Sequence, residues 1–235
     1  ASPVVSPLAE DCMKLYYHPA STTSRPIMLY AEDNGLRVEY RLVDLFHGEQ
    51  YKDEFVAVNP CHMVPVLDDG DFRLTESSAI LKYLADATGS PGYPSALRER
   101  ARVNERMDWV NTQLSRDFTY GFVYPQLLPM FKRKDDVVQQ ATLDWGRERA
   151  RDWLGVLDRN VLGDRAYLCG NEVTIADYFA APFVALGEAI RCDYSPYPNI
   201  RRWLDSMKAR PSWRKVNETI DGYAASLKDT AFVGL

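Results

Sequence analysis

A polar segment, Thr75-Glu76-Ser77-Ser78, comes directly before a helical pattern of apolar residues that ends at Gly89. A helix that begins here has free backbone N–H groups and a partial positive charge in its first turn. These groups stabilise a bound carboxylate. The segment therefore predicts a carboxylate-binding position, although Thr75 and Ser78 are also suited to cap the helix.

A proline interrupts the apolar run before this segment, in "NPCHMVPVLDD" at 59–69. Pro65 has no backbone N–H and does not belong in a central strand, although Val64 and Val66 favour one. Two conformations remain open on these residues alone. The proline either lies in trans on an edge strand or follows a cis bond, which costs little only before proline.

Hydroxyl side chains are concentrated in a third segment, "YYHPASTTSR" at 16–25. They belong to Tyr16, Tyr17, Ser21, Thr22, Thr23 and Ser24. A hydroxyl that donates a hydrogen bond to an anion stabilises it by roughly 1.5–3 kcal/mol. Ser24 is placed to cap the helix that follows, and Thr22 and Thr23 are expected as loop residues.

The elements that position these segments alternate between strand and helix. Four strands are expected, at 14–18, 38–45, 65–69 and 72–74. Three helices are expected, at 24–35, 49–59 and 75–89. Asp69-Gly70 is expected as the hairpin turn between the last two strands. The order β-α-β-α-β-β-α predicts a small mixed sheet with helices on its faces.

The rest of the chain contains only helical patterns, the longest at 100–114 and 139–162. Trp109, Trp145 and Trp153 are expected as core anchors of these helices. In "GNEVTIADYF", Thr174 and Asp177 predict a reciprocal cap at the start of a buried helix. Four parts are therefore expected: a loose extension over 1–12, an α/β domain over 13–89, a linker over 90–96 and an all-helical domain over 97–235.

The composition of the 235 residues, 46% hydrophobic and 26% charged, fits a folded protein. The net charge of −5 disfavours nucleic acid as a partner, because the densest basic run, 131–136, contains its own aspartates. The four cysteines and three histidines have no metal-binding spacing, and the scattered cysteines predict a reducing compartment such as the cytoplasm. No apolar stretch approaches about 18 residues, so no membrane span is expected.

Taken together, this pattern resembles the glutathione transferases over essentially all of residues 13–220. The resemblance lies in several motifs that occur in the same order. The segment "YYHPASTTSR" is similar to the strand-to-helix turn of the delta and theta classes, and "NPCHMVPVL" is similar to their N-P-x-x-x-[VI]-P-x-L segment. The segment "LTESSAILKYL" is similar to their glutathione-binding turn, and "GNEVTIADYFAAP" is similar to the folding signature of their helical domain. It implies a thioredoxin-like domain followed by an all-helical domain, with glutathione as co-substrate.

The resemblance also implies how glutathione is held. In this family the bond before Pro65 is cis, and the Val64 N–H and C=O face outward, unpaired with any strand, to bond the cysteinyl backbone. At the γ-glutamyl end, Ser77 is expected to bind the carboxylate and Glu76 the ammonium.

The glycyl end of glutathione is expected near His62, which matches a histidine of delta-class relatives. An isolated surface histidine remains open as the alternative. Gln50 occupies a position where those classes often carry histidine, so it is a second candidate for this end. Cys61 is expected as a bystander thiol.

The S-x-x-x-R pattern of the delta and theta classes falls on Ser21 and Arg25, which implies that the Ser21 hydroxyl activates the thiol. Lowering a thiol pKa of about 8.5 by about 2 units needs about 2.7 kcal/mol, which one hydroxyl and a helix N-terminus can supply. Tyr17 is the alternative, because other classes use a tyrosine here. Arg25 is expected in a structural ion pair. No cysteine lies between 13 and 60, which disfavours a mixed disulfide with the enzyme.

The electrophile pocket is expected between the domains, along "RDFTYGFVYPQLLPMF" at 116–131. Aromatic walls are expected from Phe118, Tyr120, Phe122 and Tyr124, with Arg116 as a polar contact. Core packing remains the alternative for each of them.

The expected function is that of a cytoplasmic glutathione S-transferase, a detoxification enzyme that conjugates the thiolate to a small hydrophobic electrophile and forms a homodimer. Glutathione-dependent dehalogenation, peroxide reduction or isomerisation would use the same thiolate. A non-catalytic ligand-binding or regulatory member of the fold is the alternative from another class. No metal, nucleic acid or membrane is expected as a partner.

Overall fold

The computed structural model of the chain describes residues 13–235, and the extension expected over 1–12 lies outside the described residues. The first half contains a four-stranded sheet in the spatial order β2-β1-β3-β4. Its strands are β1 (Met13–Tyr17), β2 (Val38–Leu42), β3 (Val66–Asp69) and β4 (Phe72–Thr75). β1 is parallel to β2 and antiparallel to β3, which is antiparallel to β4. The expected mixed sheet is confirmed.

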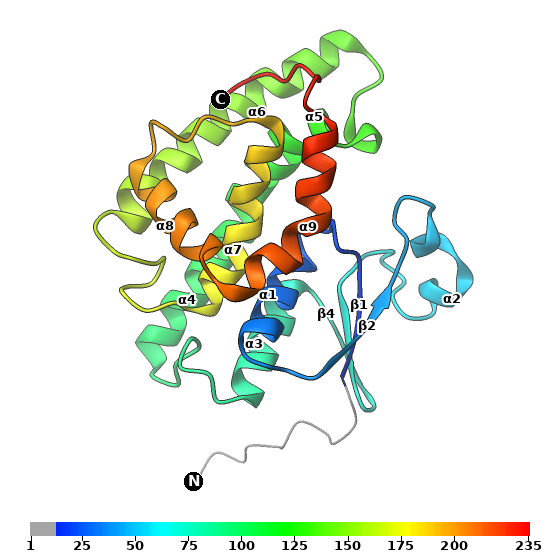
Figure 1. Cartoon of the computed structure of the whole chain (residues 1–235), viewed down its shortest axis with the longest axis vertical. Helices are drawn as coiled ribbons and strands as arrows, with labels where there is room; N and C mark the ends of the chain where they lie inside the picture. The colour runs from blue at the N-terminus through cyan, green and yellow to red at the C-terminus, as the bar shows by residue number, and fades with distance from the viewer. Residues whose placement is uncertain (1–12) are drawn as a thin grey trace.

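The helices of this half are α1 (Arg25–Asp33), η1 (Glu49–Tyr51), α2 (Asp53–Val56) and α3 (Ser77–Ala87). Figure 1 shows α2 at the outer side of the sheet, whereas α1 and α3 lie on the side that faces the rest of the molecule. The order β-α-β-α-β-β-α of a thioredoxin-like domain is therefore confirmed.

The hairpin between β3 and β4 turns one residue later than expected. Asp69 is the last residue of β3 and pairs with Phe72, so the two loop residues are Gly70 and Asp71. Gly70 has a φ of 63°, in the left-handed region that glycine adopts without a Cβ clash. Because this conformation belongs inside the loop, Asp69 stays in the strand.

Apart from an isolated bridge between Tyr167 and Gly170, the elements of the second half are all helices, as expected. Its elements are α4 (Leu97–Trp109), η2 (Val110–Val123), α5 (Tyr124–Leu127), η3 (Pro129–Phe131), α6 (Asp136–Val156), η4 (Leu157–Leu162), α7 (Ile175–Ala185), η5 (Leu186–Ile190), α8 (Pro198–Lys208) and α9 (Pro211–Ser226). η2 continues α4 in wider π-helical turns, which are frequent at functional sites. Among residues 13–235, no helix is long and apolar enough to cross a membrane.

Both halves share one hydrophobic core. α1 packs against α7 and α9, as Figure 1 shows, and α3 also contacts α7. Leu15 of β1, Ile27 of α1 and Phe179 of α7 are all buried in this core. The loop between β1 and α1 is thereby held at the junction of the two halves.

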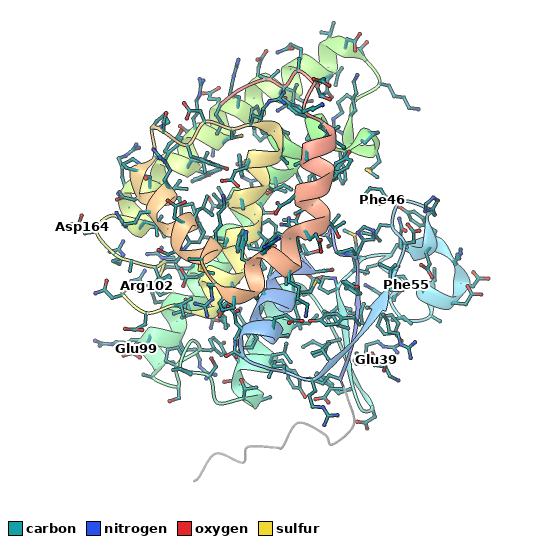
Figure 2. The ribbon with its side chains drawn as sticks, in the orientation of Figure 1. Glu39, Phe46, Phe55, Glu99, Arg102 and Asp164 are labelled. Atoms are coloured by element: carbon teal, nitrogen blue, oxygen red, sulfur yellow. The ribbon has the colours of Figure 1, made fainter. Side chains whose placement is uncertain are left out.

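A smaller apolar cluster lies on the other side of the sheet and consists of Val43, Phe55, Val64 and Val66. Figure 2 shows Phe55 on the side of the sheet that faces away from the helical half, and Phe46 on a loop beside it. The Phe46 side chain is 52% exposed. Because Val64 and Val66 both belong to the cluster, the backbone on either side of Pro65 is anchored.

Two expectations about the helical half have different outcomes. Thr174 and Asp177 form the expected reciprocal cap of α7, with the Thr174 N–H donating to Asp177 Oδ2 at 2.8 Å. Trp109 and Trp153 pack against the core as expected. Trp145, however, is 52% exposed, so its expected role as a core anchor is wrong.

Candidate functional site

The loop between β1 and α1 holds Ser21 against the start of the helix. Ser21 Oγ accepts a hydrogen bond from the Ser24 N–H at 3.2 Å. The expectation that the Ser24 hydroxyl caps α1 is wrong, since it makes no capping bond and is buried without a partner among the described residues. The Ser24 backbone is already helical (φ −78°, ψ −39°), whereas a capping side chain needs an extended backbone.

Thr23 connects this loop to the proline segment. Its Oγ1 lies 3.0 Å from Ser21 Oγ, and its hydroxyl donates to the Val64 carbonyl at 2.9 Å. The Val64–Pro65 bond is cis, and within the described residues the Val64 N–H donates no hydrogen bond. The Val64 carbonyl accepts no hydrogen bond from a neighbouring strand within the described residues, but it does accept the one from the Thr23 hydroxyl. Ser21, Thr23 and Val64 therefore form one chain of hydrogen bonds.

Tyr17, the alternative to Ser21, lies at the end of β1 but takes no part in this chain. Its ring packs edge-on against Tyr40 of β2, with the centroids 5.1 Å apart. No hydrogen bond within the described part of the chain joins its hydroxyl to Ser21 or Thr23. The geometry thus connects Ser21, and not Tyr17, to Val64.

Glu76 and Ser77 form the turn into α3. Glu76 has a φ of 64°, a left-handed conformation that costs a non-glycine residue of order 1–3 kcal/mol and is concentrated at binding and catalytic sites. The Glu76 side chain is exposed and forms no ion pair among residues 13–235. Ser77 is the buried first residue of the helix, where backbone N–H groups have no helical partner. The turn thus presents an acceptor for an ammonium beside donors for a carboxylate.

His62 and Gln50 lie together on the outer side of this region. His62 Nδ1 is 3.2 Å from the Gln50 carbonyl oxygen, and the His62 ring contacts Tyr51 with centroids 5.3 Å apart. The Gln50 amide donates to the Leu45 carbonyl at 3.4 Å, while its Oε1 is buried without a partner among the described residues. The two residues expected near the glycyl end are therefore neighbours, and Cys61 beside them is exposed.

Tyr120 and Tyr124 are brought together with Phe131. The rings of Tyr120 and Tyr124 are 4.8 Å apart, and Tyr124 also contacts Phe131 at 4.8 Å. The Tyr124 hydroxyl donates to Thr22 Oγ1 at 2.9 Å, one residue from Ser21. Burial raises the pKa of Tyr124 to about 12, so its hydroxyl stays protonated at neutral pH. An aromatic wall therefore reaches the Ser21 loop.

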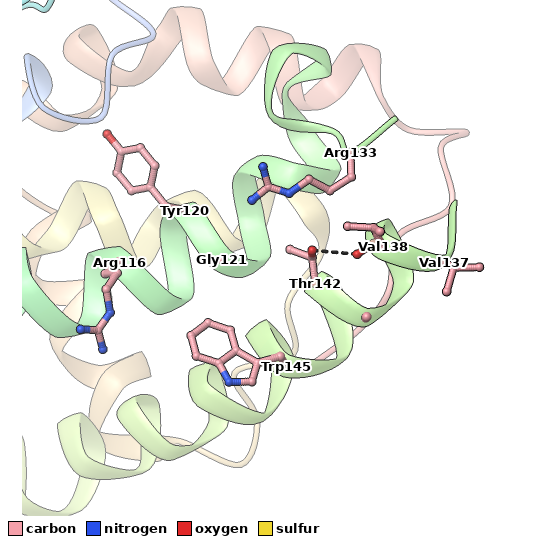
Figure 3. Close-up of a pocket in the computed structure, with 9 residues that line it drawn as sticks. Arg116, Tyr120, Gly121, Arg133, Val137, Val138, Thr142 and Trp145 are labelled. Atoms are coloured by element: carbon pink, nitrogen blue, oxygen red, sulfur yellow. Dashed lines mark hydrogen bonds between the residues drawn. The ribbon is translucent and has the colours of Figure 1, made fainter. Parts of the chain in front are cut away.

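Arg116 projects from η2 in the opposite direction from Tyr120, as Figure 3 shows. Its guanidinium binds both carboxylate oxygens of Asp117, at 2.6 and 2.9 Å. Arg116, Tyr120 and Trp145 border a cleft of about 620 Å³ between η2 and α6, which Tyr124 does not line. The structure thus joins Tyr120 to Tyr124, while Arg116 binds Asp117 and shares only the cleft with Tyr120.

Arg25 is fully buried behind the loop, where an ion pair was expected. Its Nη1 donates to the Asn217 side-chain oxygen at 2.6 Å, so the direct partner is an amide and that expectation is wrong. Nε and Nη2 have no partner among the described residues. Burial lowers the pKa of Arg25 to about 10, although electrostatic interactions with Tyr124 and Asp221 oppose the shift. Arg25 holds α1 to α9 and lies inside the core.

The structure decides the roles of four residues that the sequence had left open or expected only in a loop. Phe118 and Phe122 are fully buried, so core packing is their role. Thr22 and Thr23, expected only as loop residues, connect the loop to Tyr124 and to Val64. The one signal for them was the run of hydroxyls itself. Within the described residues, no group of three or more His, Cys, Asp or Glu side chains is arranged to hold a metal ion.

Known proteins match this chain over most of its length. The protein-family model for the glutathione S-transferase N-terminal domain matches residues 12–86. The family model for the glutathione S-transferase C-terminal domain matches residues 124–211. Glutathione S-transferase D7 of Drosophila melanogaster is 31% identical over 224 residues, which cover 92% of this chain and 94% of that protein. Glutathione S-transferase theta-2 of Homo sapiens is 34% identical over 206 residues, 84% of this chain and 81% of that protein.

Solved structures agree with these similarities. A delta-class glutathione transferase of Nilaparvata lugens has a TM-score of 0.79 at 32% identity, covering 92% of this chain and 99% of its own. Human glutathione transferase theta-2, in complex with glutathione and an unknown ligand, has a TM-score of 0.79 at 30% identity, covering 95% and 93%. With its thioredoxin-like domain, its helical domain and these matches across both, the chain belongs to the glutathione S-transferase family of enzymes.

Proposed function

We propose that this enzyme binds glutathione along the Val64 backbone, activates its thiol through the Ser21 hydroxyl and conjugates the thiolate to a small hydrophobic electrophile. The observation that carries the proposal is the hydrogen-bond chain from Ser21 through Thr23 to the Val64 carbonyl, with steps of 3.0 and 2.9 Å. A cysteinyl backbone bonded at Val64 has its sulfur one methylene away, within reach of Ser21. The similar human theta-2 protein has been solved with glutathione, which supports the choice of thiol.

The ends of glutathione match the charges around Val64. The γ-glutamyl carboxylate is suited to Ser77 and the N–H groups at the start of α3, and the ammonium to the exposed Glu76 carboxylate. The glycyl end is then directed toward His62 and Gln50, which are neighbours in the structure. These two residues precede Val64 in the sequence, whereas Glu76 and Ser77 follow it. The tripeptide therefore lies across the segment from 50 to 77.

The Ser21 hydroxyl and the start of α1 together can supply the free energy that thiol activation needs. A thiolate at neutral pH requires the thiol pKa to fall from about 8.5 by about 2 units, or about 2.7 kcal/mol. A hydroxyl hydrogen bond to an anion contributes roughly 1.5–3 kcal/mol. The partial positive charge at the start of α1, where the Ser24 N–H already bonds Ser21, adds to this.

The electrophile is proposed to lie against Tyr120 and Tyr124, which form the aromatic wall nearest Ser21. Arg116 borders the neighbouring cleft and offers a polar contact to a longer substrate only if it leaves Asp117. An apolar, aromatic wall favours a small hydrophobic electrophile over a charged one. Dehalogenation, peroxide reduction and isomerisation would use the same thiolate, so the choice among them depends on the electrophile.

A homodimer and a reducing compartment such as the cytoplasm complete the proposal. The first follows from the family resemblance, and the second is in keeping with the free thiols of Cys61, Cys169 and Cys192. Light scattering at micromolar concentration should give twice the chain mass of 26.8 kDa. A monomer alone would contradict the assembly.

The test of thiol activation compares Ser21→Ala with Tyr17→Phe, each saturated with glutathione. Ser21→Ala should leave glutathione affinity nearly unchanged, raise the pKa of the bound thiol and slow conjugation of chlorodinitrobenzene by roughly 10- to 100-fold, for a loss of about 1.4–2.7 kcal/mol. Ultraviolet titration of the thiolate measures the pKa. If Tyr17→Phe shifts this titration and Ser21→Ala does not, the tyrosine is the activating residue. If the parent protein binds glutathione but does not turn over chlorodinitrobenzene, it is a non-catalytic, ligand-binding member.

A further inference from the structure

The direction of the hydrogen-bond chain at Thr23 determines where the Ser21 proton points. A carbonyl oxygen only accepts hydrogen bonds, so Thr23 uses its single hydroxyl proton on Val64, 2.9 Å away. Thr23 Oγ1 can then only accept from Ser21, 3.0 Å away. Ser21 Oγ itself accepts the Ser24 N–H. In this arrangement the Ser21 proton is directed at Thr23 and is not offered to a ligand.

We propose that Thr23 is a positioning residue whose hydroxyl reverses direction when glutathione binds and so releases the Ser21 proton to the thiolate. The inference rests on the proposed roles of Ser21 and Val64. Once the cysteinyl N–H bonds the Val64 carbonyl, that oxygen keeps a donor without Thr23. Thr23 turns its proton to Ser21 Oγ, and Ser21 turns its own to the sulfur. Each hydroxyl keeps its proton on its own oxygen, and the thiol proton leaves to solvent.

Charge drives the reversal. A hydrogen bond from Ser21 to a thiolate is roughly twice as strong as one from Ser21 to the neutral Thr23 hydroxyl. After the reversal Ser21 donates to an anion and accepts from Thr23, so the two bonds polarise each other in the same direction, by about 10–30% per bond. After the reversal the Val64 carbonyl accepts from the ligand, and Ser21 Oγ accepts from both Thr23 and the Ser24 N–H. Only Thr23 Oγ1 loses its donor, and the stronger hydrogen bond to the thiolate outweighs that loss. Binding at Val64 is thereby coupled to activation at Ser21.

Thr22 provides a matched comparison at the adjacent position. Its hydroxyl accepts from Tyr124 at 2.9 Å, and no hydrogen bond within residues 13–235 joins it to Ser21. Thr→Val removes a hydroxyl with little change of shape at both positions. Thr23→Val should therefore affect the bound thiol, while Thr22→Val should leave the pKa of that thiol unchanged.

The experiment titrates the bound thiol by ultraviolet absorbance in the full-length enzyme saturated with glutathione, and measures glutathione affinity by calorimetry. Thr23→Val should raise the pKa of the bound thiol by about half a unit, a factor of about three in its ionisation. Glutathione should bind at least as tightly, because Val64 no longer holds a competing hydroxyl. Thr23→Ser, which restores the hydroxyl, should return the pKa to the parent value.

A cycle with Ser21→Ala separates this inference from the proposed function. In the Ser21→Ala background, Thr23→Val should produce no further rise in the pKa of the bound thiol. If Ser21→Ala raises this pKa and Thr23→Val does not, the positioning role is overturned and Ser21 stands alone. If Thr23→Val raises it equally in both backgrounds, Thr23 acts without Ser21 and the inference is again overturned. If Ser21→Ala has no effect, the proposed activation by serine falls, and the inference with it.

Discussion

At the scale of single residues, Glu76 combines a left-handed backbone with an exposed carboxylate at the start of α3. The strain at this position is independent of the side-chain charge, so Glu76→Gln keeps the shape of the turn and removes only the charge. We expect this variant to fold normally and to bind glutathione about tenfold more weakly, a loss of about 1.4 kcal/mol, because the γ-glutamyl ammonium loses its counter-charge. Titration calorimetry measures the affinity.

The control for Glu76→Gln is Glu54→Gln, which removes an exposed carboxylate from α2. Its affinity for glutathione should equal that of the parent enzyme. Equal affinity in both variants would remove Glu76 from the binding site, and equal weakening would mean that overall charge, not Glu76, controls binding.

At the scale of elements, α7 begins with a cap whose carboxylate serves more than one element. Asp177 accepts hydrogen bonds from the Thr174 N–H and hydroxyl, from the Leu168 N–H at 2.9 Å and from Trp203 Nε1 at 3.0 Å. Thr174→Ala should cost about 1–2 kcal/mol, as for an ordinary helix cap. Asp177→Ala should cost at least about 3 kcal/mol, because several buried donors lose their acceptor together.

Denaturant unfolding followed by tryptophan fluorescence measures both free energies of unfolding. The order of the two variants is the informative result. If Thr174→Ala is as costly as Asp177→Ala, the contacts to Leu168 and Trp203 contribute nothing beyond the cap.

At the scale of the whole molecule, Asp33 at the end of α1 joins the two halves. Its carboxylate is 3% exposed and accepts hydrogen bonds from Tyr178 of α7 at 3.0 Å, from the Ser212 N–H of α9 at 3.2 Å and from Arg210. Burial alone raises the pKa of Asp33, but the hydrogen bonds from Arg210, Ser212 and Tyr178 outweigh it and hold the pKa below its ordinary value.

A lowered pKa in the folded state means that the ionised Asp33 stabilises the fold above its unfolded pKa of about 3.9, and that this contribution is lost as the pH falls through the folded pKa. We expect Asp33→Asn to lose about 2–3 kcal/mol at neutral pH and to depend less on pH below about 4. Glu32→Gln, which breaks the exposed pair with Lys215, should change stability by less than about 1 kcal/mol. Parallel pH profiles for parent and Asp33→Asn would contradict the linkage.

The sequence alone was enough to predict the order of the elements, a helix start near Thr75, the unusual position of Pro65 and the cap at Thr174 and Asp177; the structure moved that helix start to Ser77. Each of these features depends on residues within a few positions of one another, because strand and helix periodicity, proline geometry and helix capping are short-range in the sequence. The motifs for glutathione are local in the same sense. The family resemblance therefore implied that Ser21 and Val64 belong to one site, and in the structure Thr23 connects them.

Contacts between side chains far apart in the sequence became known only from the folded structure. Thr23 meets the Val64 carbonyl 41 positions later, Tyr124 meets Thr22 102 positions earlier, and Arg25 meets Asn217 192 positions later. Such pairs cannot be predicted from the periodicity of the sequence, because they depend on how α1 packs against the sheet and the helical half. Elsewhere, α6 packs against η2 and leaves Trp145 half exposed, while Arg116 on η2 binds Asp117. Residue types therefore identified the groups that could do chemistry, but the direction of each hydrogen bond followed from packing, since a hydroxyl donates to whichever acceptor the fold brings within reach.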